Sequence, residues 1–239
     1  SLMVCSISAA FFLQAQDVST IRNTVDVYSN GTLKASAKYN SMAGSNGALG
    51  GDGTSLLNNP AGLGVAISGS MSGTLLVENY KNTSTLNGSA IDYNNTNADA
   101  SVSGVTVFQL LTETPWKFVN LGFNYTSQNL DNYIETPGNS NVKLQKNLLD
   151  VNNNPVVGNL SYLGHAYNRT GTISKMALGV GANYDNRLYF GLGLNLHGSE
   201  LEQYDTEAFG LDLDNSVTNF DKQYTPFSES GSGFSANIG

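Results

Sequence analysis

Residues Lys175–His197 read KMALGVGANYDNRLYFGLGLNLH, and this stretch carries the clearest fold signal in the chain. Large apolar side chains alternate with small or polar ones on both sides of Asp185–Asn186. A period of two places each set on one face of a strand, so the stretch predicts two antiparallel strands joined by a tight turn. One face would carry Met176, Leu178, Val180, Leu188, Phe190, Leu192 and Leu194, and the other Gly179, Gly181, Gly191, Gly193 and Asn195.

The same alternation recurs along the chain, and the connections between the alternating segments differ in length. Further segments with this period are Val65–Val77, Phe118–Thr126, the weaker Val102–Leu111, and the beginning of a strand in Ser232–Gly239. Two connections are short, Thr112–Lys117 and Asp185–Asn186, and three are long and polar, Glu78–Ser101, Asn129–Ser174 and Ser199–Gly231. Long loops at one end and tight turns at the other are typical of membrane β-barrels. The sequence therefore predicts an all-β, antiparallel transmembrane β-barrel.

In this interpretation the large apolar face of Lys175–His197 contacts lipid, and its glycine face lines the lumen. Trp116, Phe118, Tyr184 and Tyr189 flank the two short turns, where an aromatic girdle at the periplasmic interface would lie. A soluble β-sandwich gives the same alternation within each strand and is the alternative. Sandwiches do not usually sort their long and short loops by end, which favours the barrel.

The domain organisation follows from the number of strands. Roughly five strands and the start of a sixth cannot close a barrel, because the smallest transmembrane barrels have eight strands. Since an open sheet edge in lipid is prohibitively costly, we expect residues 64–239 to be the first strands of a larger, truncated barrel. Residues 17–63 show no sustained period and are predicted to form an irregular plug, with helical turns in Asp17–Tyr28 and Asp52–Leu57.

Residues 1–16, SLMVCSISAAFFLQAQ, have the apolar character of a secretion signal, with a cleavage site near Ala15 or Gln16. A buried strand is the alternative. Cys5 is the only cysteine, so removal of the leader would exclude disulfides and a catalytic thiol. The net charge of −8 argues against nucleic-acid binding, which needs clustered Lys and Arg.

No arrangement of residues in the sequence predicts an enzyme, a cofactor or a metal site. His165 and His197 lack partners at metal-ligand spacing, and the stretch from Asp150 begins like a calcium loop but has Pro155 where a glycine is required. An acidic cluster could bind Ca²⁺ that bridges to lipopolysaccharide, although a solvated acidic loop is the commoner explanation. The cluster comprises Glu200, Glu202, Asp205, Glu207, Asp212, Asp214 and Asp221.

The predicted plug carries a family resemblance. The stretches DVSTIRNTVDVYSN (17–30), AGSNGALGGD (43–52) and NNPAGLG (58–64) resemble the FadL-type outer-membrane transport family, particularly its Bacteroidetes branch, sometimes labelled hemin receptors. The resemblance implies a 14-stranded barrel whose N-terminal segment forms a hatch in the lumen. It assigns hatch or gate roles to Asn59, Pro60, Ala61, Gly44, Gly47, Gly50 and Gly51. Ala43-Gly44 departs from the pattern, because relatives more often have a glycine pair there.

The same resemblance implies a function, a location and partners. The protein would take up hydrophobic small molecules, such as long-chain fatty acids, passively across the outer membrane of a Gram-negative bacterium. Its partners would be outer-membrane lipid, lipopolysaccharide and the hydrophobic ligand. A barrel subunit of a secretion machine that binds exported proteins and a surface β-sandwich adhesin are the alternative functions. No ligand-contacting residue of the family maps onto this sequence.

Overall fold

The computed structural model describes residues 25, 27–28, 34–45, 47–111, 113–149, 152–213, 216–223 and 226–239. The chain divides into two units, Ser1–Leu33 and Lys34–Gly239. Of the first unit only Val25, Val27 and Tyr28 are described, and all three are helical. The predicted leader, residues 1–16, lies outside the described residues.

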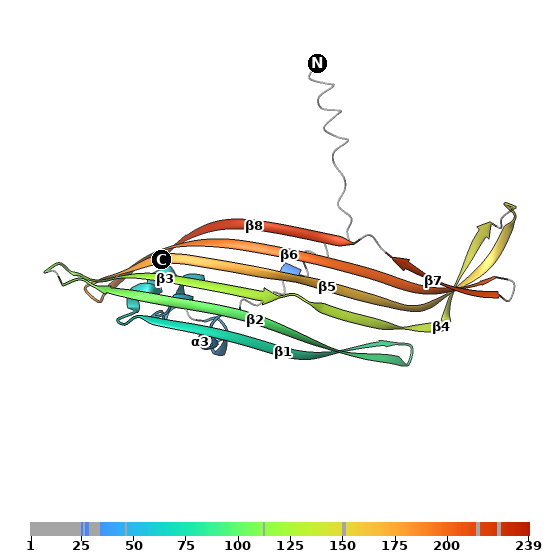
Figure 1. The fold of residues 1–239 in the computed structure, drawn as a ribbon, viewed down its shortest axis with the longest axis horizontal. Helices are drawn as coiled ribbons and strands as arrows, with labels where there is room; N and C mark the ends of the chain where they lie inside the picture. The colour runs from blue at the N-terminus through green and yellow to red at the C-terminus, as the bar shows by residue number, and fades with distance from the viewer. Residues whose placement is uncertain are drawn as a thin grey trace, which may run out of the picture. The chain divides into compact units, whose positions relative to one another are not determined.

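The second unit is built on one antiparallel sheet, which confirms the all-β prediction (Figure 1). The sheet curls as a half-barrel would. Its described strands are β1 (Ser70–Leu86), β2 (Ser89–Gln109), β3 (Trp116–Asn129), β4 (Asn132–Leu149), β5 (Pro155–Tyr184), β6 (Leu188–Leu213), β7 (Ser216–Gln223) and β8 (Phe227–Ile238).

The two longest strands, β5 and β6, each pair with two successive strands along one edge. β3 pairs with the Thr172–Tyr184 part of β5, and β4 pairs with the Pro155–Arg169 part. On β6, β8 pairs with Leu192–Gln203 and β7 with Thr206–Leu213. β5 and β6 are therefore the central strands of the sheet.

The three connections predicted to be long loops are mostly strand, and the loop prediction is wrong. Glu78–Ser101 forms the far half of the β1–β2 hairpin, turning at Asn87-Gly88 with positive φ at both residues. Asn129–Ser174 contains β4 and most of β5, whereas Ser199–Gly231 contains most of β6 and all of β7. These stretches are polar on both faces, so no hydrophobic period marks them as strands. Backbone pairing with neighbouring strands decides their structure.

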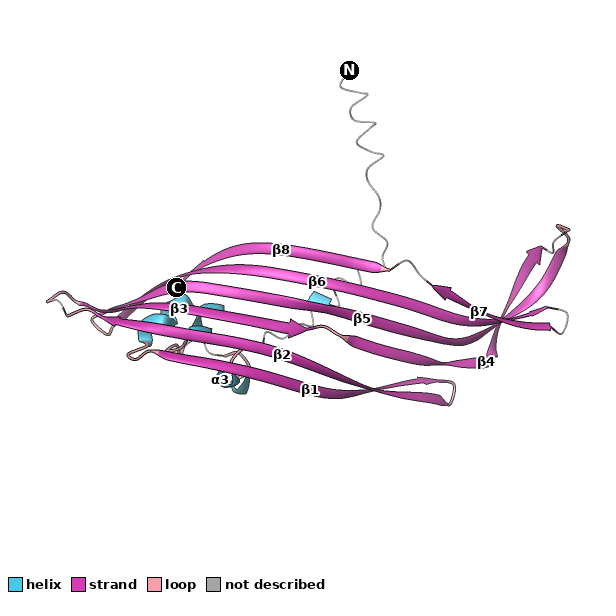
Figure 2. Ribbon diagram, viewed as in Figure 1, coloured by secondary structure: helices cyan, strands magenta, loops and turns pink. Residues whose placement is uncertain are grey.

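The first strand also begins later than predicted. Residues Pro60–Val65 form a 3₁₀ helix, η2, and β1 starts at Ser70, so Val65 and Ile67 precede the sheet. The turn predicted at Asp52–Leu57 is confirmed as the 3₁₀ helix η1 (Gly53–Leu57), and the Asp52 side chain accepts a hydrogen bond from Thr54 N at its start. A short helix, α3 (Ala37–Ser41), precedes it (Figure 2). No helix in the described part of the chain is long and apolar enough to cross a membrane.

The sheet has two chemically different faces. We call the face that contacts η1 and η2 the inner face, and the opposite one the outer face. The outer face carries the large apolar side chains predicted to share one side, and Leu178, Leu192 and Leu194 are 45%, 46% and 47% exposed. The inner face carries glycine, asparagine and serine, as the alternation predicts. Leu192 packs against no second sheet, since all the described strands belong to one sheet.

The aromatic residues beside the short turns divide between the two faces. Trp116 packs edge-on against Tyr184, with ring centroids 5.1 Å apart, and lies 6.2 Å from Phe190 on the outer face. Phe118 and Tyr189 both pair with Asn183 in the strand register, which places them on the inner face instead. The expectation of one girdle of four aromatics is therefore wrong for Phe118 and Tyr189. The shift in register between Trp116 and Phe118 separates them.

Candidate functional site: a glycine seat and a polar inner wall

The glycines of the inner face form a depression in which residues 47–66, the inner segment, are seated. A Cβ atom at Gly122 would lie 2.5 Å from Leu63 Cδ2, and one at Gly181 would lie 2.5 Å from Leu63 Cβ. A Cβ atom at Gly179 would overlap Leu56, and one at Gly191 would overlap the backbone of Pro60. Glycine in a strand interior often marks such a close approach of another backbone. We call Gly122, Gly179, Gly181 and Gly191 the glycine seat.

Apolar and polar contacts together fix the inner segment on this seat. Leu56 and Leu63 are fully buried and form a small core with Ala66, Val105 and Ala177. The side-chain amide of Asn120, itself fully buried, donates to the carbonyl oxygens of Leu63 at 2.7 Å and Ala66 at 2.8 Å. Buried backbone carbonyls need such partners, because an unsatisfied one costs free energy.

Asn59, Pro60 and Ala61 lie together at the start of η2, where they act on the conformation of the inner segment. The Asn59 side chain accepts a hydrogen bond from Ala61 N at 3.1 Å and donates one to Gly47 O at 3.1 Å. Pro60 occupies the first helical position, where its missing N–H costs nothing. Asn59 has the extended backbone, with φ −147° and ψ 103°, that a residue before proline favours.

The glycines predicted for the hatch have unequal roles. Gly44, Gly50 and Gly51 have φ values of 78°, 58° and 88°, a region that favours glycine. Gly51 N also donates to Gly62 O at 2.8 Å, which brings the two ends of the inner segment together. Gly47 has no such φ and would tolerate a Cβ atom, whose nearest neighbour is 3.8 Å away. Ala43, at the position that departs from the family pattern, also has a positive φ of 50°.

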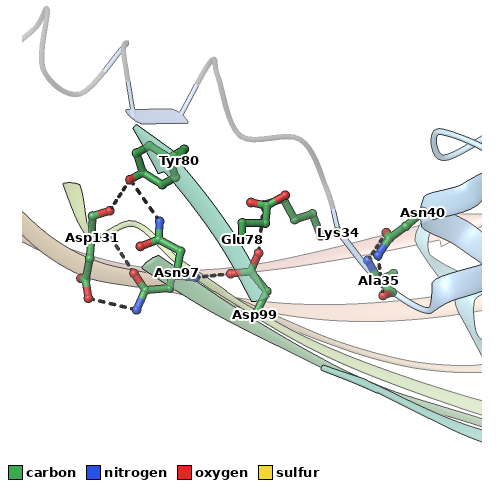
Figure 3. A network of polar contacts seen from close by, with 9 residues as sticks. Lys34, Ala35, Asn40, Glu78, Tyr80, Asn97, Asp99 and Asp131 are labelled. Carbon is green, nitrogen blue, oxygen red and sulfur yellow. Dashed lines mark hydrogen bonds and ion pairs between the residues drawn. The ribbon is translucent and has the colours of Figure 1, made fainter. Parts of the chain in front are cut away.

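Lys34 ties the chain preceding α3 to β1 and β2 (Figure 3). Its ammonium contacts Asp99 Oδ2 at 3.0 Å and also pairs with the Glu78 carboxylate. The Asp99 side chain is only 5% exposed, and Asp99 Oδ1 accepts a hydrogen bond from Asn129 N at 2.7 Å. Burial alone would lower the pKa of Lys34, but hydrogen bonds and charges from Glu78 and Asp99 outweigh it and raise the pKa above 10.5.

The same network continues to the point where β3 gives way to β4. Tyr80 donates to Asp131 O at 2.9 Å (Figure 3). Asp131 Oδ1 accepts from Gly171 N at 3.0 Å. The Asn95 side chain accepts from Tyr133 N at 3.2 Å and donates to Tyr133 O at 3.0 Å. Side chains therefore join β2 to β4, which are not paired neighbours in the described part of the sheet.

The histidines and acidic residues considered above as metal ligands are spread over β5, β6 and β7 in the described part of the chain. His165 Nε2 lies 3.1 Å from Asp205 Oδ1, and His197 Nε2 lies 3.2 Å from Ser235 Oγ. No group of three or more His, Cys, Asp and Glu residues that could hold a metal occurs among the described residues. The acidic cluster was predicted on a loop, but its described members lie on β6 and β7. Asp214 is outside the described residues.

Sequence reasoning missed Lys34, Asp99 and Asn120, which hold the N-terminal residues to the sheet. Asn120 had a readable signal, because it occupies the small-residue face of an otherwise alternating strand. Lys34 and Asp99 had none, since they are 65 positions apart. Comparisons with family models, curated proteins and solved structures found no match to this chain.

Proposed function

We propose that this chain belongs to an outer-membrane transport protein of the FadL type, which takes up hydrophobic small molecules passively through a β-barrel. The glycine seat is the observation that carries the proposal. Four positions of the inner face are glycine, and any side chain there would collide with the irregular N-terminal segment. The inner face therefore has the shape that a bound plug requires. Together with the NNPAGLG stretch, this supports a hatch that sits inside a barrel.

The outer face supports a membrane location. Its large apolar side chains extend over Met176–Tyr184 and Leu188–Leu196, each about nine residues long, which matches the length of a tilted membrane-spanning strand. Beyond them the outer face changes to a row of small and polar residues, which is expected at the headgroup level. This row comprises Ser127, Ser174, Gly198 and Ser232. We call the two ranges the apolar belt and take them as the membrane-spanning parts of β5 and β6.

Two features support closure into a barrel. Among the described strands, β1 and β8 each pair with one neighbour, so each has an edge with unpaired backbone groups. Such an edge is not viable in lipid, and further strands would satisfy it. In addition, the inner face is rich in glycine, serine and asparagine, as a lumen requires.

The proposed mechanism is gated passive movement. The strands beyond the apolar belt capture the hydrophobic molecule, and displacement of residues 34–66 from the inner wall opens its path. Few apolar side chains hold this segment, so its release is expected to cost much less than unfolding the sheet. Transport would then follow the concentration gradient without a cofactor.

The test is uptake by the complete protein in proteoliposomes. We expect entry of a fluorescent long-chain fatty acid above the level in protein-free liposomes, and recovery of the protein in the outer-membrane fraction of a Gram-negative host. Deleting Ser41–Leu57 should leave a heat-resistant barrel but raise leakage of small solutes. A protein without uptake that instead copurifies with large exported proteins would contradict transport and favour the secretion alternative.

A further inference from the structure

Lys175 occupies an unusual position on the inner wall. It lies on β5, two residues before Ala177 and on the same face, beyond the glycine seat. Its side chain is half-buried. In the strand register it pairs with Thr126 of β3 on one side and with His197 of β6 on the other. Within the described part of the chain, its ammonium forms no hydrogen bond or ion pair. A partly buried charge without a partner costs free energy, and a bound anion would reduce that cost.

The surroundings of Lys175 are short of negative charge. In the register, the nearest acidic residue on β2 is Asp99, one row farther along the wall, and Asp99 is already bound by Lys34. Glu229 of β8 lies two rows beyond His197. Burial lowers the pKa of Lys175, and burial together with the Lys175 charge lowers the pKa of His197. Both cationic forms would therefore be stabilised by an anion.

Hydrogen-bonding groups surround the same place. His197 Nε2 lies 3.2 Å from Ser235 Oγ, and Asn195 Nδ2 donates to Ser235 Oγ at 3.3 Å. Thr126 presents a hydroxyl group from the other side, in the row it shares with Lys175. Ammonium and protonated imidazole groups form charge-assisted hydrogen bonds to carboxylate and phosphate oxygens, and a hydroxyl group is a further donor to them.

We propose that Lys175 and His197 form a binding site for an oxyanion, a carboxylate or a phosphate group, on the inner wall next to the glycine seat. The site deepens the proposed function, on which its role in transport rests, because it lies on the same face one row beyond Ala177, which packs against Leu56 of the inner segment. A solute with an anionic head would be held there by its charged end. The binding step itself does not require transport.

The test is an NMR titration of the histidine ring signals in the complete, detergent-solubilised protein. Inorganic phosphate, acetate and octanoate are titrated separately at constant ionic strength, and His197→Gln assigns the His197 signal. We expect the His197 signal to shift with saturation, whereas the His165 signal stays unchanged. Tighter binding of octanoate than of acetate identifies the head of an amphiphile as the ligand, whereas equal binding identifies a free anion.

Variants separate the site from a general effect of salt. Lys175→Met should weaken binding by about tenfold or more, because it removes the charge that pairs with the anion. Lys175→Arg keeps the charge and should restore binding. Lys81→Met is the matched control, since Lys81 pairs with Asp92 at 2.6 Å on the β1–β2 hairpin. Equal shifts of His165 and His197, or unchanged binding in Lys175→Met, would overturn the proposal.

Two further results keep the tests independent. If Lys175→Met does not fold, the comparison of His197 with His165 in the unmodified protein still decides whether the site exists. Saturable binding without liposome uptake would leave the anion site standing and contradict transport. Uptake without saturable binding would contradict the anion site and leave the transport proposal standing.

Discussion

The side chain of Asn120 on β3 donates a hydrogen bond to the carbonyl oxygen of Leu63 in η2, at 2.7 Å and without exposure to solvent. The same amide also donates to Ala66 O at 2.8 Å. One residue of the wall thus satisfies two carbonyl groups of the inner segment. Polar wall residues therefore fix the position of this segment together with its apolar contacts.

Replacing Asn120 with alanine should loosen the inner segment. Ala66 O would lose the Asn120 donor and Leu63 O would keep only its hydrogen bond from Ala66 N at 3.1 Å, at a cost of about 1–3 kcal/mol. Hydrogen exchange measured by mass spectrometry should show lower protection of residues 53–66. Asn124→Ala is a matched control on the same strand and face, because Asn124 is fully buried and its side-chain atoms have no hydrogen-bond partner. Equal loss of protection in both variants would contradict the role of Asn120.

Adding a side chain to the glycine seat should push the inner segment off the wall. Gly181→Val would drive a branched side chain into Leu63, whereas Gly73→Ala on β1 meets nothing within 4 Å and serves as the control. We expect limited proteolysis to cleave the chain within residues 47–66 much faster in Gly181→Val, with the heat-modifiable mobility expected of the proposed barrel retained. Unchanged cleavage would show that the glycines are not needed for seating.

The ion pairs of Lys34 should hold the chain before α3 to the sheet in a pH-dependent way. Because the folded pKa of Lys34 is raised above 10.5, its contribution to stability is fully present below pH 10.5. It is lost as the pH rises through the higher folded pKa, when the ammonium loses its proton. Hydrogen exchange of residues 34–45, measured against pH and corrected for the intrinsic rate, should show this loss.

Lys34→Met should weaken the same attachment at neutral pH, since it leaves Asp99 buried without its cation. Lys38→Met is the control, because Lys38 pairs with Asp52 at 3.1 Å but is 53% exposed, and exposed pairs contribute about 0–1 kcal/mol. An effect of Lys38→Met as large as that of Lys34→Met would argue against a special role for the buried pair.

A charge on the outer face should be costly within the apolar belt and tolerated beyond it. Leu192→Arg would place a guanidinium near the middle of the proposed membrane-spanning part of β6, at a cost of about 2–4 kcal/mol. Ser174→Arg, in the small polar row of the same face, should cost about 0–1 kcal/mol. Reversible unfolding in lipid vesicles measures both values. Similar costs for the two variants would contradict the membrane position of the belt.

The sequence by itself determined the features that depend on neighbouring residues. The period of two in Lys175–His197 defined two strands and sorted their side chains between the faces, because alternate residues of a strand point in opposite directions. Asp185 and Asn186 marked the turn between them, and both adopt positive φ. Asn59 has the extended backbone that a residue before proline favours, although the helix η2, and not a strand, follows it.

Only the tertiary structure decided the rest. The polar stretches became strands because their backbone groups pair with neighbours far along the chain, and polarity on both faces leaves no period to read. It also showed which glycines are needed, since Gly179 and Gly191 matter only because Leu56 and Pro60 lie against them. The Lys34–Asp99 pair joins residues 65 positions apart, and no local pattern specifies which distant carboxylate a lysine will meet.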